Sequence, residues 1–90
     1  MPKKRSRLNI INDMLASIQN SGGEIKPTHL MYKSNLSHTQ MTSYLEEMLE
    51  KEVIKKIKKS NYDYIIITEK GFDFFNKLKE MREFEKTFGL

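Results

Sequence analysis

The sequence predicts an α+β domain with a helical core, a β-hairpin and a longer C-terminal helix. Three observations support this prediction. The stretch SHTQMTSYLEEMLEK (37–51) has the apolar spacing of an amphipathic helix. Two runs rich in isoleucine, 53–58 and 64–68, flank a polar turn at 59–63, as in a hairpin. Residues 69–87 again show helical spacing. Ninety residues suffice for one domain, with a core near the lower limit for unaided folding.

The helix expected from residue 37 changes character along its polar face. Ser37 and Gln40 have capping-box spacing, so the helix should start there. Its apolar stripe is Met41, Tyr44, Leu45, Met48 and Leu49. The polar face begins with neutral side chains and ends with Glu46, Glu47 and Glu50. Only its front end therefore suits contact with a polyanion, although an ordinary solvated face would also explain the pattern.

The residues before this helix predict a helix-turn-helix. Ser6 can cap a first helix, which ends at Asn20–Gly23 with glycines past its terminus. Residues 24–26 should be extended because they precede Pro27, and Pro27 suits the first position of a short second helix that runs to about residue 33. Asn35 is a good left-handed terminator, and Leu36 can supply the accompanying apolar contact.

The hairpin and the last helix follow from local signals. A hairpin of this length is unstable alone, so it should lie on the helices, with its lysines toward the tip and Ile25 available for a third strand. Thr68 can cap the final helix, and Gly71 would allow that helix to approach the sheet closely. Phe72 and Phe75 should join the core.

A second apolar stripe follows the final helix with heptad-like spacing. Its members are Phe74, Leu78, Met81, Phe84 and Phe88. Left exposed, this stripe would be an aggregation hazard, so we expect it to pair with a second copy of the chain. The alternative is that it folds back onto the first helix.

Charge is concentrated in two segments. Residues 1–33 hold six basic and two acidic side chains, and residues 53–63 hold four basic and one acidic. Local basic clusters are typical of nucleic-acid binding, although solubilising lysines give the same pattern. The chain has no cysteine, no apolar run that could span a membrane and no visible signal peptide. We therefore expect a cytoplasmic protein.

The predicted order of elements is that of a winged helix, and the sequence resembles one such family. The stretches KRSRLNII, KPTHLMYKSNLSHTQMTSYLEEMLEKEVI and IITEKGFDFF resemble the small archaeal winged-helix regulators, which include the dimeric chromatin proteins of Sulfolobus. The resemblance extends to about Phe75, and the final helix is shorter than in the chromatin proteins. It implies a basic arm (1–7), a DNA-binding winged helix (8–68) and a C-terminal dimerisation helix (69–90) in a transcriptional regulator or chromatin-associated protein.

DNA binding would need phosphate and base contacts from three segments. The candidates are Lys3, Lys4, Arg5 and Arg7 in the arm; His38, Thr39, Gln40, Thr42 and Ser43 on the helix; and Lys55, Lys58, Lys59 and Asn61 on the wing. The front of the helix has no arginine or lysine for the commonest guanine contact. We therefore expect modest sequence specificity, with affinity carried by arm and wing.

Other function classes have weaker support. His29 and His38 lack partners at metal-ligand spacing, and the sequence has no glycine-rich phosphate loop or nucleophile signature. We expect no catalysis, metal, cofactor, small-molecule ligand or membrane association. The main alternative to DNA binding is a winged helix that binds proteins through the stripe from Phe74 to Phe88.

Overall fold

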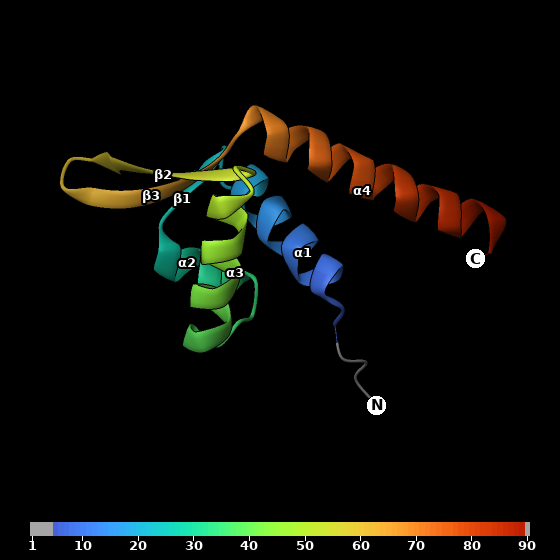
Figure 1. The fold of residues 1–90 in the computed structure, drawn as a ribbon, viewed down its shortest axis with the longest axis horizontal. Coiled ribbons are helices and arrows are strands. Elements are labelled where there is room, and N and C mark those ends of the chain that lie inside the picture. The colour runs from blue at the N-terminus through green and yellow to red at the C-terminus, as the bar shows by residue number, and fades with distance from the viewer. Residues whose placement is uncertain (1–4, 90) are drawn as a thin grey trace.

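The computed structural model describes residues 5–89 and shows a winged helix (Figure 1). The elements in chain order are α1 (Arg7–Asn20), β1 (Glu24–Ile25), α2 (Pro27–Lys33), α3 (His38–Glu50), β2 (Ile54–Lys59), β3 (Tyr62–Ile67) and α4 (Glu69–Phe88). Helices α2 and α3 lie on one side of the sheet, the β2–β3 hairpin projects to one end, and α4 extends past α1 at the other. The predicted fold class is confirmed.

The helix boundaries lie where the capping residues predict. Ser37 Oγ accepts a hydrogen bond from Gln40 N at 3.1 Å, and Gln40 Oε1 accepts one from Ser37 N at 3.0 Å, which completes the capping box. Asn35 is left-handed with φ 54°, and Leu36 N donates to Met31 O at 3.1 Å. The hydrogen bond from Leu36 to Met31 is typical of a Schellman motif, which ends α2 where the chain turns toward α3.

The sheet is antiparallel in the order β1-β3-β2. Ile25 pairs with Ile65, which confirms the expected third strand. The hairpin turn is tighter than expected: strands β2 and β3 continue to Lys59 and from Tyr62. Only Ser60 and Asn61 remain between them, at φ 49° and 70°, and two left-handed residues are what a two-residue type I′ hairpin requires.

One core joins the three domain helices to the sheet. Its fully buried members include Met14, Leu15, Ile18, Leu30 and Ile65. Phe75 packs against this core as expected, but Phe72 is 43% exposed, so its assignment to the core was wrong. Residues three apart on a helix are only about 60° apart around its axis, so Phe72 lies at the solvent-exposed edge of the face through which Phe75 meets the domain.

Helix α4 begins in close contact with the end of α3. Thr68 Oγ1 accepts a hydrogen bond from Gly71 N at 3.0 Å and donates one to Glu52 O at 2.6 Å. A Cβ atom on Gly71 would lie 1.9 Å from Val53 O, so no larger residue fits without moving the backbone. The glycine thus allows α4 to start against residues 52–53, as its position in the sequence predicted.

Candidate nucleic-acid interface

The front end of α3 faces solvent. All five predicted helix residues of the interface are exposed: His38, Thr39, Gln40, Thr42 and Ser43. The opposite face of the helix is held in the core through Met41 and Met48. The front end therefore presents a neutral, polar surface that is available to a ligand.

Two of these side chains already have partners in the protein. Gln40 uses its carbonyl oxygen in the capping box, so its amide NH₂ group remains for an outside acceptor. Thr42 donates its hydroxyl proton to His38 O at 3.0 Å and retains acceptor capacity. His38, Thr39 and Ser43 make no side-chain hydrogen bond with the residues that the structure describes. The helix can thus offer both donors and acceptors at one end.

Strand geometry places the wing lysines on two different faces. Successive side chains of β2 point to opposite sides of the sheet. Ile54 is buried against the helices, so Lys56 and Lys58 share its face and project beyond the core. Lys55 and Lys59 lie on the opposite face. Because α3 lies on the Ile54 face, Lys56 and Lys58 are the lysines on the same side of the sheet as α3.

Lys59 of the outer face, and Lys26 at the start of α2, are engaged within the protein. Lys59 donates to Glu24 Oε1 at 2.8 Å, and this hydrogen bond, with the carboxylate's charge, raises the pKa of Lys59. Its ammonium group also lies 5.6 Å from the centre of the Tyr64 ring, and Lys26 lies 4.3 Å from that of Tyr62. Between residues 5 and 89, neither Lys56 nor Lys58 forms an ion pair. Lys55, on the outer face, also forms no ion pair in that range, and the acidic Asp63 lies opposite Lys58 in the strand register. Of the three wing lysines without an ion pair, two therefore lie on the face that carries α3.

Arg5, which was expected to contact DNA from the basic arm, is bound to the helix-turn-helix instead. Its Nη1 lies 3.0 Å from Asp13 Oδ2 and donates to Ser34 O at 2.7 Å. Its Nη2 donates to Asn35 O at 2.8 Å. These carbonyls belong to the end of α2, where backbone acceptors lack helical donors. Arg5 thus fastens the turn before α3 to helix α1.

We expect Arg5→Ala to lower the free energy of unfolding by about 1–2 kcal/mol, because two backbone acceptors and one carboxylate lose a charged donor. Urea unfolding of the DNA-free protein measures this. Arg5→Lys serves as the control, since it keeps the charge but not the fork geometry, and it should recover only part of the loss. Unchanged stability in Arg5→Ala would show that the contacts are incidental.

Arg7 is also engaged. It is the first residue of α1 and forms an ion pair with Glu47 of α3. The pair cancels one acidic charge on α3 that was expected to repel phosphates. Of the four arm candidates, the structure therefore uses Arg5 and Arg7 internally, while Lys3 and Lys4 lie outside the described residues.

Residue Lys56 was not among the predicted wing contacts. The run IKKIKK does not alternate cleanly, so the sequence did not reveal which lysines share a face. No local signal could have done so, because the face of each lysine is set by strand register, which places Lys56 opposite the buried Ile65. Asn61 lies at the hairpin tip in a left-handed conformation, exposed as predicted.

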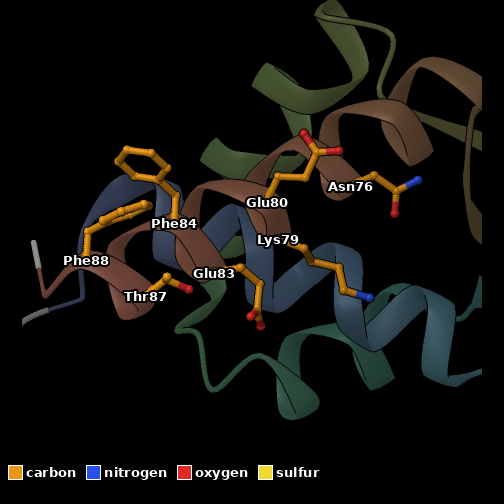
Figure 2. A pocket seen from close by; sticks show the side chains of 7 residues that line it. All are labelled: Asn76, Lys79, Glu80, Glu83, Phe84, Thr87 and Phe88. Atoms are coloured by element: carbon orange, nitrogen blue, oxygen red, sulfur yellow. The ribbon is translucent and has the colours of Figure 1, made fainter.

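The apolar stripe of α4 is partly covered by α1. Leu78 is buried, and Arg82 Nη2 donates to Asn9 Oδ1 at 3.1 Å, so this part of α4 lies on α1. Met81, Phe84 and Phe88 remain exposed, at 52%, 56% and 64%. Figure 2 shows the Phe84 and Phe88 rings side by side near the end of α4, and their centres are 4.8 Å apart. The stripe thus divides into a covered half and an open half.

This order and geometry agree with one protein family. A family model described as winged helix-turn-helix matches residues 4–86. The chain belongs to the winged helix-turn-helix family. A search of curated proteins finds no match to this winged-helix sequence.

Solved structures share the winged-helix fold at low sequence identity. Sso10a-2 from Sulfolobus solfataricus, a DNA-binding protein, superposes with a TM-score of 0.79 at 17% identity, over 93% of this chain and 85% of that one. F93 from STIV, a winged-helix DNA-binding protein, gives 0.75 at 18% identity, over 93% and 95%. A MarR family transcriptional regulator from Silicibacter pomeroyi gives 0.74 at 12% identity, over 86% of this chain and 53% of that one.

Other kinds of site are not seen in the described part of this winged helix. Across residues 5–89, no cluster of three or more histidine, aspartate and glutamate side chains could hold a metal ion. Over the same range, no helix is both long enough and apolar enough to cross a membrane.

Proposed function

We propose that the protein binds duplex DNA, with the front of α3 in the major groove and the wing beside it. One observation carries the proposal: the exposed, uncharged end of α3 lies on the same side of the sheet as Lys56 and Lys58, two wing lysines without an ion pair among the described residues. Phosphates attract these lysines, and the polar side chains of α3 can reach base edges. A DNA partner would place the protein with the chromosome in the cytoplasm.

The mode of binding follows from the side chains that α3 offers. Its front holds hydroxyls, an imidazole and an amide, and no arginine or lysine. Bidentate guanine contacts, the commonest specific ones, are therefore missing there. We propose that backbone contacts from Lys56, Lys58 and helix-start N–H groups supply most of the affinity, as in an architectural protein or a regulator of modest specificity.

A salt titration with random-sequence duplex tests this function. If the protein neutralises several phosphates, log Kd should rise steeply with log salt, by about 0.9 per phosphate. Fluorescence anisotropy between about 50 and 200 mM salt measures the slope. Binding that is undetectable at the lowest salt, or that does not respond to salt, would contradict DNA binding and favour a winged helix that binds proteins through α4.

The open half of the α4 stripe supports a second copy of the chain as partner. Three large apolar side chains lie within two turns of the helix and outside the domain core. A C2 pair of such helices would bury them against each other, since an isologous interface uses the same patch twice. The pair would also present two α3 helices to one duplex, and successive major grooves require them to be about 34–36 Å apart.

We expect the double substitution Met81→Asp/Phe84→Asp to produce a monomer, because two carboxylates would be buried without partners in the pair. Sedimentation equilibrium measures the mass. The control is Phe72→Asp, at another exposed apolar position of α4 on a different face, which should leave the dimer intact. A double variant that keeps the wild-type mass would refute this interface.

A further inference from the structure

A small cavity lies between α1, the last turns of α3 and the first turns of α4. Its volume is about 300 Å³, which is the lower end of the range for small-molecule sites. The floor is apolar and is formed by Ile11, Met48 and Phe74. The DNA-binding surface proposed above does not use these residues. The cavity therefore needs an explanation of its own.

The rim of the cavity is basic. Arg7, Lys51 and Lys70 border it, each from a different helix or helix end. Glu47 is the single acidic residue of the lining and is paired with Arg7. Lys51 and Lys70 have no ion-pair partner between residues 5 and 89. The rim therefore carries two uncompensated positive charges above an apolar floor.

We propose that this cavity binds a small amphipathic anion, with its apolar body on the floor and a carboxylate, sulfonate or phosphate group at the rim. Apolar burial and a few convergent polar groups are what small-molecule sites use for affinity and orientation. Ammonium groups at the rim attract an anion and repel a cation of the same shape. The apolar floor thus favours a ligand with an apolar body, and the basic rim favours a ligand with a negative charge.

The site is distinct from the proposed dimer surface. Phe74, at the domain end of the α4 stripe, lines the cavity, whereas the open half of the stripe begins at Met81. Phe74 and Phe84 are ten residues apart, or about 15 Å along the helix. An occupant would contact Met48 and Lys51 at the far end of α3 from its exposed front. The cavity can therefore be occupied while α3 and the dimer face remain accessible.

Titration with naphthalene-1-carboxylate, followed by calorimetry and by amide chemical shifts, tests the site in the full chain without DNA. The carboxylate should bind at one site per chain, shift Ile11, Met48 and Phe74, and raise Tm. The amine analogue, 1-naphthylmethylamine, should bind at least about tenfold more weakly. Absence of binding, equal affinity for the amine, or shifts confined to Met81–Phe88 would each overturn the proposal.

Charge reversal at the rim separates a specific site from general attraction to a basic protein. Lys51→Glu/Lys70→Glu should weaken binding of the carboxylate at least about tenfold, because attraction becomes repulsion at contact distance. Lys79→Glu/Lys86→Glu changes the net charge equally on exposed positions of α4 that do not line the cavity. It should leave the affinity within about twofold, since exposed charges beyond a Debye length are screened. Equal loss in both variants would contradict a cavity site.

Discussion

The variant Lys56→Ala/Lys58→Ala should bind duplex DNA at least about tenfold more weakly at low salt, and the slope of log Kd against log salt should fall by about 2. Both lysines lie on the sheet face that carries α3, and neither has a partner ion among the described residues. The loss should be similar for all duplex sequences, because phosphate contacts do not read bases. Anisotropy titrations at several salt concentrations measure both quantities.

The control is Lys55→Ala/Lys59→Ala, which removes the same charge from the outer face of the same strand. Lys59 is already bound to Glu24, so its loss should cost little DNA affinity, within about threefold for the pair. Equal weakening in the two double variants would show that only net charge matters. In that case the face of the wing on which a lysine lies would not affect DNA affinity.

Gly71→Ala should lower the free energy of unfolding by about 2–3 kcal/mol, although alanine normally favours a helix over glycine. The added Cβ would lie 1.9 Å from Val53 O and 2.8 Å from Val53 C, and a backbone carbonyl cannot rotate away as a flexible side chain can. Val53 O also accepts a hydrogen bond from Thr68 N at 3.2 Å, so a shift would disturb the start of α4.

Urea unfolding followed by circular dichroism measures this change. Asp73→Ala is the matched control, since it makes the same final residue at an exposed position two residues later on α4. It should change stability by no more than about 0.5 kcal/mol. A loss of similar size in both variants, or none in Gly71→Ala, would show that the close approach of α4 to residue 53 does not limit stability.

Features determined by neighbouring residues were predictable from the sequence. The capping box of Ser37 and Gln40, the left-handed Asn35 and the Thr68 cap all depend on bonds within about five residues. Their short range explains why the helix-turn-helix and the start of α4 were placed correctly. The same signals positioned the front of α3, which the structure leaves exposed.

Features determined by distant residues were not predictable. Arg5 bonds to carbonyls 29 and 30 residues away, and the Arg7–Glu47 pair joins α1 to α3. No local pattern distinguishes such arginines from ones in a free basic arm. The division of the wing lysines depends on strand register, and the burial of Leu78 depends on how α4 lies against α1. Both features depend on tertiary contacts, which composition and periodicity do not determine.

Amide chemical shifts during titration with a duplex of about 20 base pairs would test most directly whether α3 and the wing form one DNA-binding surface. We predict the largest changes at residues 38–43 and 56–61, saturating together as a single event. Changes that spare either segment, or that concentrate on α4 while the front of α3 stays unaffected, would contradict a DNA-binding surface shared by α3 and the wing.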